Sequence, residues 1–212
     1  MTLPVLYDFP RAPSPRRARI VLAEKGIAHD TVRVDLASGE QRGAAYCAIN
    51  PAQTVPALRL ADGTVLTDNA GIAAWAEAVR PQPPLLGRDA IDKAQVASWT
   101  QRIENEGLWA IAEAVRNSAP AMAGRALPGP HDYAQIPALA ERGKARFAAF
   151  LDTLEAQLAG RDFVTAGGFS VADIVGGVAL DFARVIGVDG SAGRPGIAAW
   201  RARLAERASF AL

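Results

Sequence analysis

Short apolar runs alternate with amphipathic segments along the first part of the chain. The run "LPVLY" (residues 3–7) is short and broken by a proline, which favours a strand. Residues 15–25 then place apolar side chains three and four positions apart, with Gly26 where a C-terminal helix cap belongs. Polar and apolar residues alternate in "TVRVD" (residues 31–35), as in a half-buried strand, and a short helix is predicted around residues 40–48.

A hairpin and a further helix complete this part of the pattern. The segments "PALRL" (residues 56–60) and "TVLT" (residues 64–67) flank an Asp62-Gly63 pair, which is a strong short-range hairpin signal. Residues 69–79 return to helical spacing. Residues 1–80 are therefore predicted to form a small α/β domain with the order β-α-β-α-β-β-α.

Strand signals end at a proline-rich segment, residues 81–90. Three prolines within residues 81–84 cannot continue a helix, so this segment is predicted to be a linker. Residues 118–137 are rich in proline and glycine, and a loop of that length in a compact domain is either mobile or functional. Apolar residues at steps of three and four predict an all-helical domain over residues 91–212, with helices at 91–117, 147–158, 171–186 and 195–207.

The composition is that of an ordinary globular protein. Half of the 212 residues are hydrophobic and 21% are charged, with a formal net charge of +1. A charge so close to balance argues against nucleic-acid binding as the main function. The single cysteine, Cys47, cannot form an internal disulfide, and the first residues lack the pattern of a signal peptide. Because no apolar run reaches about 18 residues, we expect a cytoplasmic protein with no membrane partner.

The stretch "RAPSPRRARI" (residues 11–20) has the composition of a helix start. Ser14 suits the N-cap and Pro15 suits the first helical position. A hydroxyl there lies beside free backbone N–H groups and the positive end of the helix dipole, which together stabilise an anion or a thiolate. The alternative is that Ser14 only caps the helix. Most arginines of this stretch are expected in solvent, with one of them near the site.

Two further stretches have residues suited to ligand binding. In "NPAQTVPAL", Pro56 enters a strand without donating a ladder hydrogen bond. A cis peptide after Val55 would turn the backbone outward to a ligand, and a trans proline at a strand edge is the alternative. In "LTDNAG", Asp68 and Asn69 precede a helix, whose N-terminus either binds a carboxylate or is simply capped by one of them.

The second half of the chain has one structural motif and one candidate pocket. Ser170 and Asp173 in "FSVADI" have the spacing of a capping box, which is a structural feature. Side chains suited to a small-molecule cleft fall on neighbouring helical turns at Arg102, Asn105, Glu106 and Trp109. The alternative there is a solvated helix face with one packed tryptophan, and the other tryptophans are expected in the core. No metal site is expected, because neither histidine has a partner at metal-ligand spacing.

The order of these stretches resembles that of the cytosolic glutathione transferases over nearly the whole chain. The motifs that carry the resemblance are "PSPRRARIVLAEKGI", "NPAQTVPAL", the Asp68-Asn69 turn, the proline-rich linker, "SVADI" and "GIAAWRARL". Each motif alone is modestly specific, and the six in this order are strongly so. The resemblance implies an α/β thioredoxin-like N-terminal domain followed by an all-α C-terminal domain.

The resemblance also implies a glutathione site in the first domain. It implies that Val55-Pro56 is the family's cis-proline turn, whose Val55 backbone holds the cysteinyl part of glutathione. It implies that Asp68 and Asn69 hold the γ-glutamyl end. The remaining contacts with glutathione are expected at Pro13, Gln53 and Thr54.

Several positions depart from the family pattern. Ala12 occupies the slot where many serine- and cysteine-type members carry the catalytic residue. Bacterial members without that residue often have an asparagine, facing the glutathione sulfur, in the slot of Ser14. Ser14 is therefore the first catalytic candidate, and Tyr7 is the second, because tyrosine-type members use a residue at the end of this strand. Gln53 stands where glycine is usual, and Thr54 where a lysine or glutamine often holds the glycyl carboxylate.

The function implied by the resemblance is a glutathione transferase. It would bind glutathione as co-substrate, use no other cofactor, and ionise the thiol for attack on a small hydrophobic electrophile held between the domains. The family further implies a homodimer that acts in detoxification. One alternative, favoured by Ala12, is a glutathione- or ligand-binding protein without catalysis. Another is glutathione-dependent reduction of disulfides or peroxides, in which glutathione itself supplies the thiol chemistry.

Overall fold

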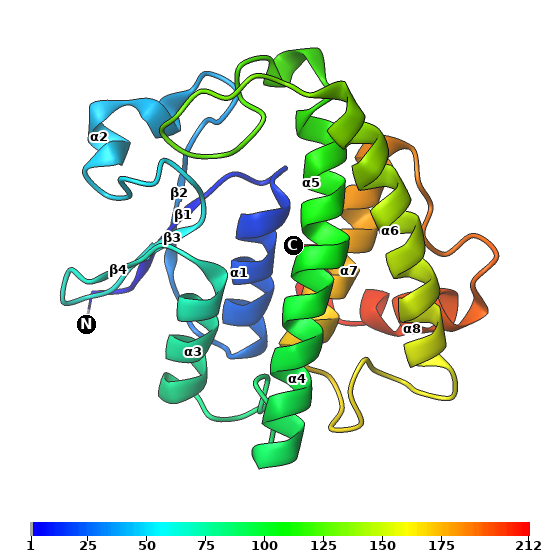
Figure 1. The fold of residues 1–212 in the computed structure, drawn as a ribbon. Coiled ribbons are helices and arrows are strands. Elements are labelled where there is room, and N and C mark those ends of the chain that lie inside the picture. The colour runs from blue at the N-terminus through cyan, green and yellow to red at the C-terminus, as the bar shows by residue number, and fades with distance from the viewer. Residues whose placement is uncertain (1) are drawn as a thin grey trace. The chain divides into compact units, whose positions relative to one another are not determined.

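The structure, a computed structural model, describes residues 2–212. Its chain forms two compact units (Figure 1). The first contains the residues up to Pro83 together with Pro128–Asp132 and Leu212. The second contains Pro84–Leu127 and Tyr133–Ala211.

The first unit is a thioredoxin-like α/β domain with a four-stranded mixed sheet of order β2-β1-β3-β4. β1 is parallel to β2 and antiparallel to β3, which is antiparallel to β4. The predicted succession of strands and helices is confirmed. The elements are β1 (Val5–Asp8), α1 (Pro13–Glu24), β2 (Asp30–Arg33), the 3₁₀ turn η1 (Glu40–Arg42), α2 (Ala44–Cys47), β3 (Ala57–Arg59), β4 (Val65–Leu66) and α3 (Asn69–Val79).

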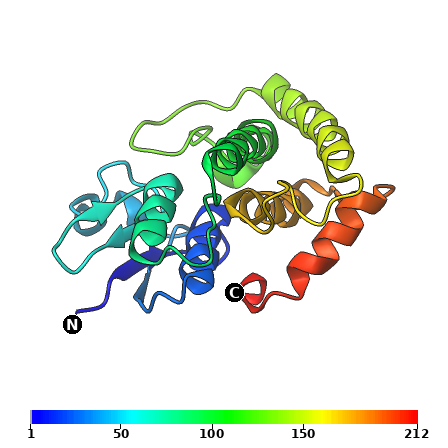
Figure 2. The same cartoon turned by 90° about the horizontal axis from the view of Figure 1, so that it is seen from below.

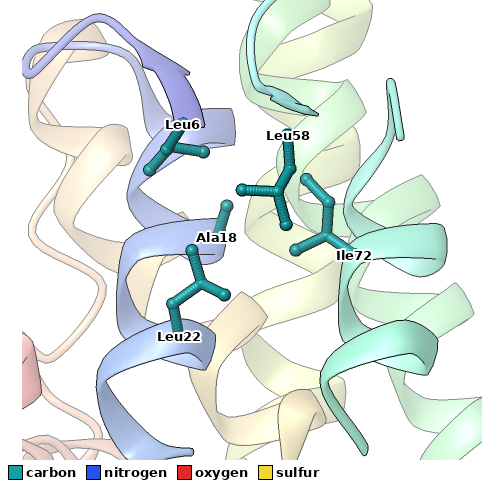
Figure 3. Close-up of a cluster of buried hydrophobic side chains, with 5 residues drawn as sticks. All are labelled: Leu6, Ala18, Leu22, Leu58 and Ile72. Atoms are coloured by element: carbon teal, nitrogen blue, oxygen red, sulfur yellow. The ribbon is translucent and has the colours of Figure 1, made fainter. Parts of the chain in front are cut away.

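Side-chain alternation along the central strands gives this sheet two apolar faces. Leu6 of β1 lies opposite Leu58 of β3 in the ladder, and both point toward the helices α1 and α3 (Figure 3). They pack there with Ala18, Leu22 and Ile72, all of them buried. The next ladder pair, Tyr7 and Ala57, points to the other face, where the cluster also contains Val34, Tyr46 and Val55.

The edge strand β2 differs from the prediction. Val32 is 42% exposed and all four residues of the strand are exposed, so a half-buried strand was wrong. β2 pairs only with β1, at the edge of the sheet, and the buried apolar residue of this segment is Val34, one position beyond the strand. The predicted hairpin at Asp62-Gly63 is confirmed, with Gly63 at φ +91° and the Asp62 carboxylate accepting from the Thr64 N–H at 2.9 Å.

The second unit is all-helical, as predicted. Seen from below, the helix formed by α4 and α5 is viewed nearly end-on, with α6 and α7 beside it (Figure 2). Gly143 of α6 allows close approach to α5, because a Cβ there would lie 2.5 Å from the Ala110 carbonyl oxygen. The elements are α4 (Ala90–Arg102), the π-helical segment η2 (Ile103–Leu108), α5 (Trp109–Arg116), η3 (Pro120–Met122), α6 (Pro137–Leu158), α7 (Val171–Ala183), η4 (Arg184–Ile186), α8 (Pro195–Ala205) and η5 (Ala208–Ala211).

A buried carboxylate connects three segments of this unit. Asp173 forms the predicted capping box with Ser170 and also accepts hydrogen bonds from the Val164 N–H at 2.8 Å and the Trp200 indole N–H at 2.9 Å. Burial raises the pKa of this carboxyl, although each of these hydrogen bonds lowers it. Among the tryptophans expected in the core, Trp200 is fully buried, whereas Trp75 and Trp99 are only partly buried.

The predicted long loop contributes to both units. Its middle part, Pro128–Asp132, belongs to the first unit, where Asp132 forms an exposed ion pair with Arg42 at 3.0 Å. Its flanks belong to the second unit, and Arg125 and Tyr133 form an isolated bridge there. No helix in the described part of the chain is both long and apolar enough to span a bilayer.

Candidate functional site

The start of α1 lies two residues earlier than predicted. Pro13 is the first helical residue and Ala12 occupies the N-cap position without a side-chain cap, so Ser14 as N-cap was wrong. Proline has no backbone N–H, and Pro13 and Pro15 therefore remove two of the donors that a helix N-terminus normally offers. The Ala12 N–H donates to the Phe9 carbonyl at 2.9 Å. Few backbone N–H groups are therefore left at this helix start to stabilise an anion. Any such stabilisation depends mainly on the side chains around Ser14.

The Ser14 hydroxyl lies in a small polar cluster between α1 and α3. Its oxygen accepts a hydrogen bond from Nη2 of Arg17 at 3.0 Å and another from Nδ2 of Asn69 at 3.0 Å. A guanidinium and an amide nitrogen can only donate, so both lone pairs of the Ser14 oxygen are occupied. No residue among 2–212 accepts the Ser14 proton, which is therefore available to solvent or to a ligand.

Asp68 and Asn69 have different roles at the start of α3. Asp68 is the N-cap, and its carboxylate accepts from the Gly71 N–H at 2.7 Å. Asn69 is the first helical residue and points its amide nitrogen at Ser14. The side-chain amide oxygen of Asn69, Oδ1, is buried and has no hydrogen-bond partner among the described residues.

The turn before β3 is held rigidly from one side. The Thr54 carbonyl accepts hydrogen bonds from the Tyr46 hydroxyl at 2.6 Å and from Nδ2 of Asn50 at 2.7 Å. Asn50 is buried, and its Oδ1 accepts from the Ala52 N–H, which closes the turn on itself. Burial raises the pKa of Tyr46 to about 12, so its phenol is a neutral donor at ordinary pH.

Four of the predicted glutathione contacts, residues 53–56, lie on this turn. The Val55-Pro56 peptide is cis, as the resemblance implied. Gln53 has φ +56°, in the left-handed region that favours glycine. This agrees with the expectation that glycine is usual at this position in the family. The backbone N–H and carbonyl of Val55 have no backbone partner among residues 2–212.

The structure does not bring Tyr7 to Ser14. The Tyr7 ring is buried on the face of the sheet away from α1, edge-on to Tyr46 at a centroid distance of 5.9 Å. The Arg59 guanidinium lies 5.8 Å from its centroid. Of the two catalytic candidates, Ser14 is therefore the one that lies in the α1–α3 cluster.

The arginines of α1 were mostly expected in solvent, but each of them makes a contact within the protein. Arg19 is largely buried, pairs with the buried Asp8 at 2.5 Å and donates to the Pro10 carbonyl at 3.2 Å. Arg16 donates to the Leu212 carbonyl at 3.3 Å. Arg17 is the one near the site. The spacing Ser14-x-x-Arg17, one helical turn, was the signal that could have identified it.

The candidate second-substrate residues lie at the π-helical segment of the second unit. Arg102 and Glu106 form an i, i+4 ion pair at 3.5 Å, and the Arg102 guanidinium also lies 5.3 Å from the ring centroid of Trp99. Asn105 is exposed, and its backbone carbonyl accepts from Arg146 at 2.7 Å. Trp109, at 48% exposure, does not pack into the core. These side chains form an exposed face, and π-helical segments occur often at functional sites.

Two residues that hold the Thr54 turn, Tyr46 and Asn50, were not singled out from the sequence. Tyr46 lies in the short helix and gives no spacing signal, while Asn50 opens the "NPAQTVPAL" motif and was a candidate by position alone. No group of three or more potential metal ligands is present within residues 2–212.

Comparisons with known proteins identify the family of this fold. Family models for the glutathione S-transferase N-terminal and C-terminal domains match residues 12–79 and 137–203. Glutathione S-transferase 2 of Saccharomyces cerevisiae is 30% identical over 97% of this chain and 87% of that protein. Glutathione S-transferase F9 of Arabidopsis thaliana is 42% identical over 42% of each chain. Maleylacetoacetate isomerase of Pseudomonas aeruginosa is 39% identical over 42% of this chain and 43% of that protein.

Solved structures cover both units. A glutathione S-transferase domain-containing protein of Marinobacter aquaeolei has a TM-score of 0.88 and 31% identity, over 97% of this chain and 98% of that one. A glutathione transferase homologue from Sulfitobacter, solved with bound glutathione, has a TM-score of 0.82 and 26% identity over 100% and 96%. With both family models matched and a full-length relative at 30% identity, this chain belongs to the glutathione S-transferase family.

Proposed function

We propose that this protein is a glutathione transferase in which Ser14 activates the thiol of glutathione. The observation that carries the proposal is the donor pattern at the Ser14 oxygen. Because Arg17 and Asn69 both donate to this oxygen, the Ser14 proton is free to donate to a sulfur. A hydroxyl donor stabilises a thiolate more than a thiol, since hydrogen bonds to a charged acceptor are the stronger ones.

The required effect is modest. A free thiol has a pKa of about 8.5, and each unit of lowering corresponds to about 1.4 kcal/mol of stabilisation. One charge-assisted hydrogen bond, worth about 1.5–3 kcal/mol, lowers the thiol pKa by roughly one to two units. The thiol proton passes to solvent, and the sulfur forms a bond to the electrophilic carbon as the leaving group departs or a proton adds.

We propose that the tripeptide lies along the Gln53–Pro56 turn and the start of α3. The Val55 backbone offers an N–H and a carbonyl for the cysteinyl part. The γ-glutamyl end is assigned to Asp68 and Asn69, at the first turn of α3. Pro13 places Ser14 at the same end of α1, and Thr54 fixes the turn through its carbonyl.

The electrophile is assigned to the exposed face around Trp109. Its indole offers apolar area, and the Arg102–Glu106 pair and Asn105 offer polar contacts beside it. We propose a homodimer from family membership, which sedimentation would report as twice the 22.3 kDa chain mass.

A binding protein without catalysis is the second candidate, because Ala12 leaves the usual catalytic slot without a polar group. Calorimetric titration with glutathione and turnover assays separate the two candidates. The assay panel comprises aryl halides, epoxides, peroxides, mixed disulfides and maleylacetoacetate, the last because one matched relative is a maleylacetoacetate isomerase.

The transferase account expects glutathione binding and conjugation of at least one electrophile. It also expects Ser14→Ala to lower kcat at least tenfold with little change in the KM for glutathione. Ser38→Ala, a serine in an exposed turn, is the matched control and keeps full activity. Binding with no turnover on any substrate would favour the non-catalytic candidate, and no binding at millimolar glutathione would overturn both.

A further inference from the structure

We propose that Arg17 is a positioning residue of the thiol site, acting on the glutathione sulfur through Ser14. This inference rests on the proposed function and adds a charge to it. Nη2 of Arg17 lies 3.0 Å from the Ser14 oxygen, one helical turn along α1. The guanidinium keeps its positive charge at every relevant pH, so it donates a charge-assisted hydrogen bond.

The need for such a charge follows from the two prolines. A helix N-terminus normally binds an anion through several backbone N–H groups and the helix dipole. Here the residues on both sides of Ser14 have no N–H, and the Ala12 N–H is bonded to Phe9. The N-terminus of α1 therefore offers the Ser14 N–H and little else from its backbone. The Arg17 side chain supplies positive charge to the same place.

Arg17 affects the Ser14 hydroxyl in two ways. It occupies one lone pair of the oxygen, while Asn69 occupies the other, and this directs the proton away from both. Donation from a cation also withdraws electron density from the oxygen, which strengthens the hydrogen bond that the hydroxyl itself donates. Both effects act on the sulfur only while the Ser14 hydroxyl is present.

The neighbouring arginines cannot replace Arg17, because each is bonded elsewhere. Arg19 pairs with Asp8 and the Pro10 carbonyl, and Arg16 donates to Leu212. The Arg17 Nε atom is buried, and its Nη2 atom contacts the Ser14 oxygen in the cluster. These contacts make Arg16→Met a matched control: the same residue type on the same helix, without a bond to Ser14.

The test measures the thiol pKa of bound glutathione from thiolate absorbance, and the affinity for S-methylglutathione, which has no thiol to ionise. Arg17→Met is expected to raise the bound thiol pKa by about one unit, a tenfold loss of thiolate. Arg17→Lys, which keeps the charge, is expected to recover part of that loss. The affinity for S-methylglutathione stays within about threefold in both variants, and Arg16→Met changes neither quantity.

The double variant Ser14→Ala/Arg17→Met tests the route of the effect. If Arg17 acts through Ser14, its replacement shifts the thiol pKa far less when Ser14 is already alanine. An equal shift in both backgrounds would overturn the inference. So would an unchanged thiol pKa in Arg17→Met when the wild-type value is depressed. A wild-type value equal to that of free glutathione would instead overturn the proposed function, and this inference with it. Should Arg17→Met not fold, Arg17→Gln makes the same comparison with a neutral donor.

Discussion

The amide nitrogen of Asn69 lies 3.0 Å from the hydroxyl oxygen of Ser14, although the two residues are 55 positions apart in the sequence. This contact joins the first turn of α3 to the first turn of α1, the two helices that pack together on one face of the sheet. It also joins the proposed γ-glutamyl contacts to the proposed thiol-activating group. If both proposed assignments hold, recognition of the γ-glutamyl end of glutathione is coupled to activation of its sulfur.

Replacing Asn69 by aspartate tests this coupling with almost no change in side-chain shape. A carboxylate cannot donate to Ser14 and adds negative charge beside the sulfur, so the bound thiol pKa is expected to rise by about one unit. Thiolate absorbance with bound glutathione measures it. Asn69→Ala, which removes the donor without adding charge, is expected to give a smaller rise. Equal thiol pKa values in wild type and Asn69→Asp would contradict the coupling.

Tyr46 is predicted to titrate above the ordinary range of a tyrosine and to stabilise the fold until it does. Burial raises its pKa to about 12 in the folded protein, against about 10 in the unfolded chain. The unfolded state therefore loses the proton first, and the contribution of this group is complete below pH 10 and lost as the pH rises through 12.

Spectrophotometric titration of the three tyrosines checks this prediction. Tyr46→Phe should remove the late phase and, by freeing the Thr54 carbonyl, weaken glutathione binding several-fold. A late phase that persists in Tyr46→Phe would show that another tyrosine is responsible.

Gln53 is predicted to be a site of backbone strain. Gln53 has φ +56°, a left-handed conformation that costs a non-glycine residue about 1–2 kcal/mol of stability. Glycine avoids this cost but loses more conformational entropy on folding, so replacement by glycine recovers only part of it. Gln53→Gly is therefore expected to raise the free energy of unfolding by about 0.5–1 kcal/mol in urea. Ala78→Gly, on the exposed face of α3, is the opposite control and should lower it by about 1 kcal/mol. A loss of stability in both variants would refute the strain.

Asp173 is predicted to be the most sensitive structural residue of the helical unit. Replacing it by alanine leaves the Val164 and Ser170 N–H groups and the Trp200 indole without their acceptor. The expected loss is about 3–5 kcal/mol, because several buried donors become unsatisfied at once. Asp152→Ala removes a largely exposed carboxylate that pairs with Arg194, and should cost under 1 kcal/mol. Unfolding followed by circular dichroism compares them, and similar losses would contradict the assignment.

Periodicity and turn chemistry were sufficient for most of the fold. The hairpin at Asp62-Gly63, the capping box at Asp173 and the two-part organisation of strands and helices all follow from local signals. The edge strand around Val32 was misjudged because alternation alone does not say whether either face of an edge strand is covered. The α1 start was misplaced because Pro13 and Pro15 both suit a first helical position, and the sequence does not rank them.

The candidate site was only partly predictable. Ser14 and Asn69 were both singled out from their motifs, but the hydrogen bond between them depends on how α1 and α3 pack. Arg17 was hidden among three arginines of one helix, whose partners are set by tertiary contacts. The role of Tyr46 likewise depends on a carbonyl eight positions away, reached only in the folded turn.

The central claim is that the Ser14 hydroxyl lowers the thiol pKa of bound glutathione. Difference absorbance of the thiolate, titrated with pH at saturating glutathione, measures that pKa directly in wild type and in Ser14→Ala. The account predicts a wild-type value roughly one to two units below about 8.5, and a value close to 8.5 in the variant. The same depressed pKa in both proteins would contradict it, and would leave Ser14 as a residue that only joins α1 to α3.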